Sequence, residues 1–202
     1  MTTTREARQD AGRAHLLDAA EEVFGRRGFH DATLKEVAEL ADVSVGSVYS
    51  FFESKDDLFL RVFARRGSAL VDGLKAIVNG PEAPLVRVRR IVGFTVGFFR
   101  EHPHFGRLYL RTSSVGSPLP GTAVDDDFRD GLERTMRLQA SVFDDGQRSG
   151  AIRGGDTLVL ARILSGVVLS YLAVDPGIVG EGGGNAMPLT QLEEMVEEMF
   201  RA

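Results

Sequence analysis

The chain contains 202 residues, of which 43% are hydrophobic, and its 24 Lys and Arg against 29 Asp and Glu leave a net charge of −5. This length and apolar content are enough to bury a core, so a wholly disordered chain is excluded. The absence of cysteine excludes disulfides, thiolate zinc sites and a cysteine nucleophile. No apolar run reaches the roughly 18 residues of a membrane span, and the opening sequence MTTTREARQD lacks the apolar core of a signal peptide. We therefore expect a cytoplasmic protein with no membrane partner.

Charge is distributed unevenly along the chain. Residues 1–60 contain 7 basic and 12 acidic residues, whereas residues 61–202 contain 17 of each. An overall basic face is therefore absent. A role in nucleic-acid binding would have to depend on a local patch.

Apolar residues recur at helical spacing along nearly the whole chain, and most of the predicted helices are bounded by polar caps or turn formers. In chain order, the predicted helices cover residues 16–27, 34–41, 44–51, 54–77, 85–100, 105–111, 125–149, 158–174 and 190–201. Thr33 with Glu36, and Thr190 with Glu193, have the spacing of a capping box. Residues 177–184 are expected to form a flexible loop. The predicted fold is all-α, with about nine helices.

Residues 33–52 carry the most specific pattern. Two helices of about eight residues flank a tight turn at residues 41–43, and helices this short are stable only when packed on a neighbour. The stripe on residues 16–24 supplies that neighbour, which predicts a helix-turn-helix on a three-helix scaffold. The second short helix has small, polar outward residues, which allow a backbone to approach base edges and phosphates closely.

The segment Leu16–Leu58 resembles the TetR family of regulators. Its matching features are the two alanines and Phe24-x-x-x-Gly28 of the first helix, the turn VAELADVS, and several single residues. These single residues are Thr33, Gly46, Tyr49, Phe52, Lys55 and Leu58. The resemblance implies a DNA-binding domain over residues 1–53 and a ligand-binding and dimerisation domain over residues 54–202.

The same resemblance implies roles for individual residues. Thr33 and Lys55 would hold phosphates, and Tyr49 would lie against the DNA backbone. The residues implied to face the major groove are Ser44, Val45, Gly46 and Ser47. Family members often have His or Tyr where this chain has Phe51, so only an apolar contact, for instance with a thymine methyl, is expected there. Arg5, Arg8 and Arg13 form an N-terminal arm that could reach the minor groove or the backbone.

The second half of the chain is rich in aromatic residues, which either fill a core or line an apolar ligand cavity. The candidate walls of such a cavity are Phe63, Phe94, Phe98, Phe105, Tyr109, Phe128, Leu132 and Met136. Arg107 or Arg111 is the candidate polar anchor, which favours a carboxylate or a phenolate. The competing interpretation is that the aromatic rings fill one another's space and leave no cavity.

Two apolar helices, residues 158–174 and the last helix, are expected to form a two-fold four-helix interface. The residues assigned to it are Leu160, Ile163, Leu164, Val167, Val168 and Tyr171, with Leu192, Met195, Val196 and Met199. A homodimer would place two recognition helices on a pseudo-palindromic operator.

The sequence contains little that indicates a metal site, catalysis or a cofactor. His102 and His104 could form part of a metal site but lack a clustered third ligand, and Asp125, Asp126 and Asp127 fit a helix start. No paired carboxylates or nucleophile-base motif is present, so we expect neither an enzyme nor a cofactor. The preferred interpretation is a ligand-responsive DNA-binding regulator, a repressor released from double-stranded operator DNA by an apolar small molecule. The alternatives are a helical partner-binding protein that no longer binds DNA, and a helical enzyme that uses the C-terminal pocket.

Overall fold

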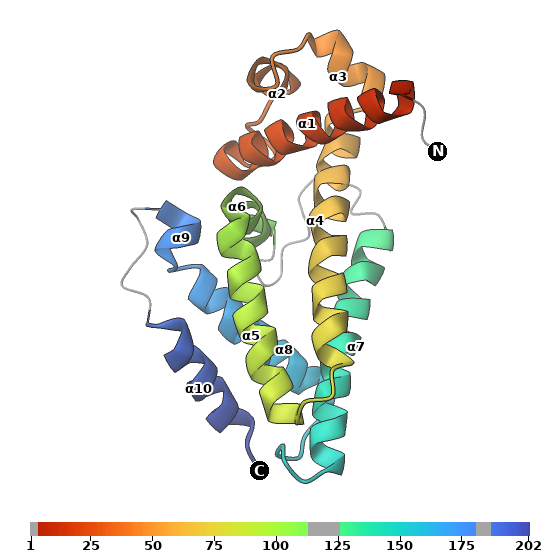
Figure 1. The fold of residues 1–202 in the computed structure, drawn as a ribbon. Coiled ribbons are helices and arrows are strands. Elements are labelled where there is room, and N and C mark those ends of the chain that lie inside the picture. The colour runs from red at the N-terminus through yellow and green to blue at the C-terminus, as the bar shows by residue number, and fades with distance from the viewer. Residues whose placement is uncertain (1–3, 113–125, 181–186) are drawn as a thin grey trace. The chain divides into compact units, whose positions relative to one another are not determined.

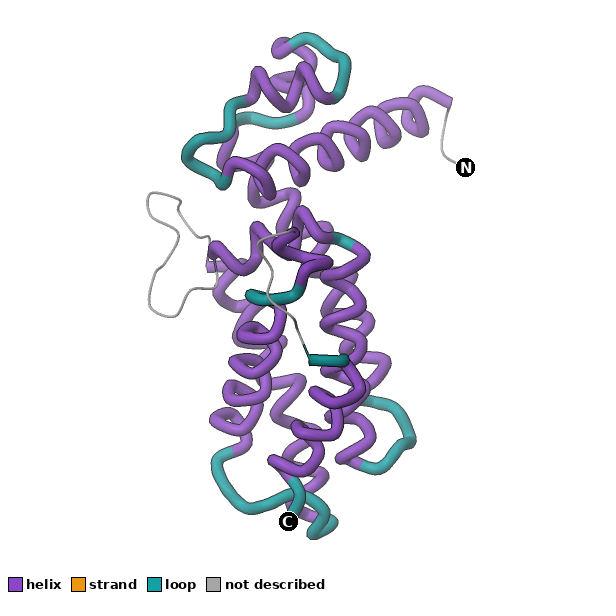
Figure 2. Tube along the Cα trace, turned by 90° about the vertical axis from the view of Figure 1, so that its left-hand side faces the viewer, coloured by secondary structure: helices purple, strands orange, loops and turns teal. Residues whose placement is uncertain are grey.

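The computed structural model describes the backbone of residues 4–112, 126–180 and 187–202, and the side chains of residues 6–112, 133–180 and 187–202. Within these ranges the chain forms ten helices (Figures 1 and 2). They are α1 (Thr4–Arg27), α2 (Leu34–Leu40), α3 (Val45–Phe51), α4 (Lys55–Val78), α5 (Pro84–Glu101), α6 (Pro103–Thr112), α7 (Asp126–Arg148), α8 (Thr157–Leu172), α9 (Pro176–Val179) and α10 (Leu189–Phe200). The all-α prediction is confirmed.

Two local predictions near the C-terminus are wrong. The expected loop at residues 177–184 is wrong at residues 177–179, which belong to the short helix α9; Asp175 caps this helix by accepting a 2.8 Å bond from the backbone N–H of Gly177. Residues 181–184 lie outside the described residues. The expected capping box of Thr190 and Glu193 does not form, because α10 begins at Leu189 directly after Pro188. Pro188 is itself the cap, with an extended ψ of 141°, so the helix starts earlier than predicted and Thr190 lies inside it.

The chain divides into two compact units. Among the described residues, the first unit contains residues 4–67 and 104–112, and the second contains residues 68–103, 126–180 and 187–202. Helix α4 contributes to both units. This division therefore differs from the predicted functional boundary between residues 53 and 54, which stays a prediction.

The core of the first unit contains a row of phenylalanine rings. The ring of Phe59 lies 5.3 Å from that of Phe24 and 4.9 Å from that of Phe63, and Phe63 lies 5.3 Å from Phe105. These contacts join α1, α4 and α6. At Gly25 of α1 a Cβ atom would lie 2.5 Å from the carbonyl oxygen of His104, so the close approach of α6 requires glycine.

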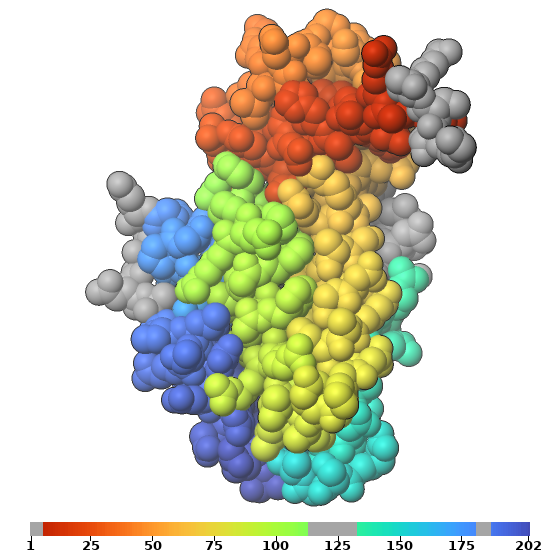
Figure 3. Space-filling model, viewed as in Figure 1, coloured from red at the N-terminus to blue at the C-terminus, as the bar shows by residue number. Residues whose placement is uncertain are grey.

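The second unit is built around α5, α7, α8 and α10. The surfaces of α4, α5 and α10 lie side by side in it (Figure 3). Arg87 is buried, and its guanidinium donates a 2.6 Å hydrogen bond to the carbonyl oxygen of Val78 and a 2.9 Å hydrogen bond to the carboxylate of Asp145. These bonds tie α5 to the end of α4 and to α7. None of the described helices is long and apolar enough to span a membrane.

The predicted interface residues of α8 and α10 are divided between the inside and the outside of this unit. Leu164 is fully buried within the chain, so its assignment to a subunit interface is wrong. The same correction applies to the other buried residues of that set, which are Leu160, Val168, Tyr171, Leu192 and Val196. Ile163 is 44% exposed and Met195 is 41% exposed, and these lie on the outside.

Candidate functional site

Helices α2 and α3 pack on α1 as the helix-turn-helix pattern predicts. Val37, Ala38 and Val48 are buried, and a side-chain nitrogen of His15 on α1 lies 3.1 Å from the carbonyl oxygen of Ala41. The turn between the two helices passes through Asp42, which has a φ of +51°. The N–H groups of Asp42 and Val43 bond back to carbonyls of α2 at 3.2 and 2.9 Å, which closes a Schellman motif. This turn fixes the direction in which α3 leaves α2.

The outer face of α3 is small, polar and exposed. Ser44 caps the helix by accepting a 3.1 Å bond from the N–H of Ser47, and the two hydroxyls lie 2.9 Å apart. Val45 is 37% exposed and Tyr49 is 57% exposed, while a Cβ at Gly46 would meet only the Ser44 hydroxyl at 3.6 Å. The structure therefore leaves the four predicted groove residues and Tyr49 accessible, with Ser47 half-buried and the others exposed. Their contact with DNA stays a prediction.

Thr33 begins α2 and forms the expected capping box. Its N–H and its hydroxyl donate hydrogen bonds of 2.9 and 3.0 Å to the Glu36 carboxylate. The hydroxyl also accepts a 3.2 Å hydrogen bond from the N–H of Glu36. The backbone and hydroxyl bonds from Thr33, together with Arg27 at 3.2 Å, hold the pKa of Glu36 below its ordinary value. A phosphate at Thr33 would therefore meet an ionised carboxylate, which weakens the predicted phosphate contact.

Lys55, the other predicted phosphate ligand, already bonds within the protein. Its Nζ donates 2.9 Å to the carbonyl oxygen of Ala32 and 3.3 Å to that of His30, and it lies 4.5 Å from the centre of the Phe29 ring. An ammonium group has three N–H donors, so one remains for a phosphate. The structure thus shows that Lys55 holds the loop before α2, and its phosphate contact stays a prediction.

Phe51 is half-buried at the end of α3 and points toward α1. A Cβ at Gly12 would lie 3.4 Å from the tip of its ring, and the ring centres of Phe51 and Phe52 are 6.4 Å apart. The guanidinium of Arg13, also on α1, lies 5.5 Å from the centre of the Phe52 ring. The end of α3 is therefore in contact with the N-terminal half of α1.

The predicted ligand walls belong to both units. Phe63, Phe105 and Tyr109 belong to the first unit, where the rings of Phe105 and Tyr109 are 6.1 Å apart. Phe94, Phe98 and Met136 belong to the second unit. The side chains of Phe128 and Leu132 lie outside the described residues.

One open groove of about 500 Å³ is found in the second unit. It is lined by Gly73, Ala76, Ile77, Arg90, Gly93, Phe94 and Glu193. Of the predicted walls whose side chains are described, only Phe94 lines this groove, and its ring packs so closely on α4 that a Cβ at Gly73 would clash with it. Phe94 is therefore held mainly by helix packing.

The two candidate anchors lie on α6 in the first unit. Arg107 lies 2.8 Å from the Nδ1 of His104, and Arg111 donates 3.4 Å to the carbonyl oxygen of Arg26. Burial lowers the pKa of Arg107, and Arg26 and Arg111 lower it further. Burial and Arg107 likewise lower the pKa of His104. The described residues contain no group of three side chains that could hold a metal ion with His102 or His104.

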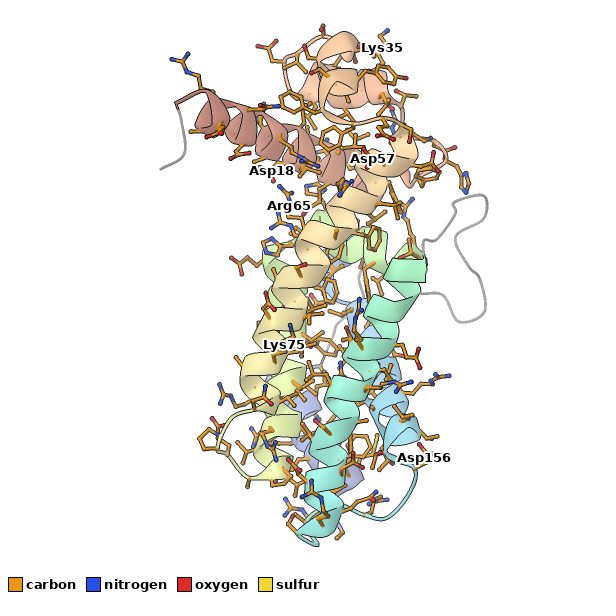
Figure 4. The ribbon with its side chains drawn as sticks, turned by 90° about the vertical axis from the view of Figure 1, so that its right-hand side faces the viewer. Asp18, Lys35, Asp57, Arg65, Lys75 and Asp156 are labelled. Carbon is orange, nitrogen blue, oxygen red and sulfur yellow. The ribbon has the colours of Figure 1, made fainter. Side chains whose placement is uncertain are left out.

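A buried carboxylate that the sequence analysis missed connects α1 to α4. Glu21 is only 5% exposed and accepts bonds of 3.0 Å from Arg65 and 2.7 Å from Arg66. Arg65 also reaches Asp18 at 2.8 Å (Figure 4). Glu21 follows Leu17 by four residues and so lies in the apolar stripe of α1, which is the signal that could have revealed it.

Comparisons with known proteins agree with this geometry. Residues 16–62 match the model of bacterial regulatory proteins of the tetR family. The HTH-type transcriptional regulator RutR of Escherichia coli K12 is 28% identical over 140 residues, which is 69% of this chain and 66% of RutR. The HTH-type transcriptional activator FasR of Mycolicibacterium smegmatis is 34% identical over 110 residues, which is 54% of this chain and 50% of FasR. The matches thus span just under two thirds of RutR and half of FasR.

The fold agrees over a larger part of the chain. The structure of FadR from Bacillus subtilis, solved in complex with stearoyl-CoA, superposes with a TM-score of 0.73 at 15% identity. The superposition covers 92% of this chain and 96% of FadR. Residues 16–62 thus match the tetR family of bacterial regulatory proteins, the geometry of α1–α3 agrees with that match, and the chain shares its fold with FadR.

Proposed function

We propose that the protein is a ligand-responsive, DNA-binding regulator of transcription that acts as a homodimeric repressor. The observation that carries this proposal is the accessible surface at the start of α3, to which Ser44, Val45, Gly46, Ser47 and Tyr49 contribute. The cap of Ser44 and the turn at Asp42 hold this face in one orientation. A rigid helix with small side chains is suited to enter the major groove.

A single recognition helix of seven residues reads too few base pairs for a specific site, so the proposal requires two copies. Exposed apolar side chains on α8 and α10 support a second copy as the partner. They are Leu158, Val159 and Ile163 of α8 and Met195 of α10, together with Val174 just after α8, each at least 41% exposed. In the dimer, two α3 helices would contact half-sites about 34–36 Å apart on a pseudo-palindromic operator.

For the effector we propose an apolar molecule with an anionic end. FadR, which shares the fold, was solved with stearoyl-CoA, a ligand of that chemistry. The candidate anchors Arg107 and Arg111 fit an anionic end, because Arg107 shares its surroundings with two other guanidinium groups. An effector that binds better to a state with altered α3 spacing would lower DNA affinity by its differential binding.

Selection of bound sites from random DNA, followed by fluorescence anisotropy on the selected operator, tests the DNA part. We expect a palindromic consensus and binding of one dimer per site, with the dimer seen in sedimentation. A wild-type protein that enriches no sequence would overturn DNA binding and favour a partner-binding protein. A stable monomer would overturn the dimer.

Titration of the DNA complex with stearoyl-CoA, stearate and benzoate tests the effector. Release of the operator at concentrations that also raise the melting temperature is the expected result. If only zinc ions or charged sugars release DNA, the apolar ligand class is wrong. A reporter gene behind the operator decides the sign of regulation, which matters because FasR is named an activator.

A further inference from the structure

The N-terminal half of α1 lies outside the core of the first unit. From residue 6 to His15 the described side chains are exposed or half-buried, and the buried residues of α1 begin at Leu16. The family match also begins at residue 16. Residues 4–15 therefore form an extension of about 18 Å at 1.5 Å per residue, and its first turns run past the end of α3 (Figure 1).

This extension is held against the helix-turn-helix. It continues without a break into the buried half of α1, and contacts with the helix-turn-helix hold its side. Three are present: the Phe51 ring against Gly12, the Arg13 guanidinium over Phe52, and the bond of His15 to Ala41. All three contacts lead to α3 or to the turn before it.

The same contacts fix the direction in which the charged side chains of the extension project. Arg8 precedes Gly12 by four residues, so it projects from the face of α1 that meets Phe51. Asp10 is two residues from Gly12 and projects from another face. The extension thus presents Arg8 and Arg13, both exposed, on the side of the recognition helix.

These two arginines differ from most basic side chains of the first unit. Arg27 pairs with Glu36 at 3.2 Å, Lys35 with Glu39 at 3.7 Å, and Lys55 donates to two carbonyls. Among the described side chains, neither Arg8 nor Arg13 has a carboxylate within ion-pair distance. Residues 1–60 contain only 7 basic residues against 12 acidic ones, so few cations remain to neutralise phosphates.

We propose that the extension of α1 is a second DNA contact, in which Arg8 and Arg13 bind phosphates that flank the bases contacted by α3. Phe51 is then the residue that docks the extension on α3, and it does not read a base. This inference rests on the proposed DNA-binding function. It explains how an acidic helix-turn-helix unit gains phosphate contacts that Lys55 and Thr33 provide only weakly.

The test measures operator affinity of the full-length protein at several salt concentrations. Each lost phosphate contact lowers the slope of log K against log salt by about 0.9, which is about eightfold in affinity at 0.1 M salt. We expect Arg8→Gln and Arg13→Gln each to show this change and the double variant to show both. Arg137→Gln is the matched control, because Arg137 is 68% exposed, pairs with Glu133 and lies in the second unit.

Hydroxyl-radical footprinting and Phe51 variants complete the test. The double arginine variant should lose only the outer protected positions, and Phe51→Ala should lose the same ones while Phe51→Leu keeps them. If the double variant keeps the wild-type slope and footprint, the extension is not a DNA contact, although the proposed function stands. If Phe51→Ala changes the preference at one base pair, Phe51 reads a base and its docking role is wrong. A wild-type protein that binds no operator overturns the proposed function itself.

Discussion

Helices α3 and α8 both expose apolar side chains, yet they are stabilised in opposite ways. Helix α3 has seven residues and buries only Val48, so its position depends on the Ser44 cap and the turn at Asp42. Helix α8 has 16 residues and buries six of them. A helix stabilised by local bonds can keep a variable outer surface, whereas a helix stabilised by burial must keep its inner surface apolar.

The largest effect on stability is expected from a charge on the buried face of α8. Leu164→Arg places an unpaired cation where the side chain is fully buried, and we expect a loss of about 3–5 kcal/mol in the free energy of unfolding. Urea denaturation followed by circular dichroism measures it. Ile163→Arg is the control: at 44% exposure it should change stability by less than about 0.5 kcal/mol. It should nevertheless produce a monomer in sedimentation.

A charge on the outer face of α3 should do the opposite. Gly46→Glu faces open space apart from Ser44, so the melting temperature should stay near that of the wild type. Placing a like charge against phosphates costs several kcal/mol, so operator affinity should fall more than about 100-fold. Fluorescence anisotropy and thermal melting of one sample measure both. Wild-type operator affinity in this variant would mean that α3 does not enter the groove.

The cap of α3 offers a smaller and more selective change. Ser44→Ala removes the acceptor for the N–H of Ser47, which should cost about 1 kcal/mol and fray the start of α3. Hydrogen exchange should quicken at Ser47 and Val48 and remain unchanged in α8. Ser44→Asp keeps an acceptor and serves as the control for stability. Equal exchange in Ser44→Ala and the wild type would show that α3 does not depend on its cap.

The smallest expected effect is the pH dependence of the capping box at the start of α2. The pKa of Glu36 is held below its ordinary value by Thr33, so ionised Glu36 stabilises the folded state. This contribution is complete above the ordinary pKa of a glutamate and is lost as the pH falls through the lowered folded value. A Glu36→Gln variant should lack this part of the acid dependence in melts between pH 3 and 6, a range set by the ordinary carboxyl pKa of about 4.3. An identical dependence of melting temperature on pH in the variant and the wild type would show that ionised Glu36 does not stabilise the folded state.

At the candidate site, the partners of Lys55 and Phe51 could not be predicted from the sequence, because they lie far away along the chain. The small outer face of α3 is visible from spacing alone, because it depends on residues within one helix. Lys55 bonds to carbonyls 23 and 25 residues earlier, and Phe51 contacts Gly12. No local pattern indicates such partners. The predicted cavity walls belong to two units of the fold, and their role in ligand binding stays a prediction.

The sequence by itself determined the all-α fold, most helix bounds and the cap at Thr33, because each depends on groups within about four residues. It did not determine which side of α8 faces inward. That helix is apolar on nearly every side, so periodicity cannot separate Leu164 from Ile163. Only the packing of α5 and α7 against α8 decided this. The tertiary structure also decided that Glu21 is buried, since the two arginines that stabilise its charge come from α4, more than 40 residues later in the chain.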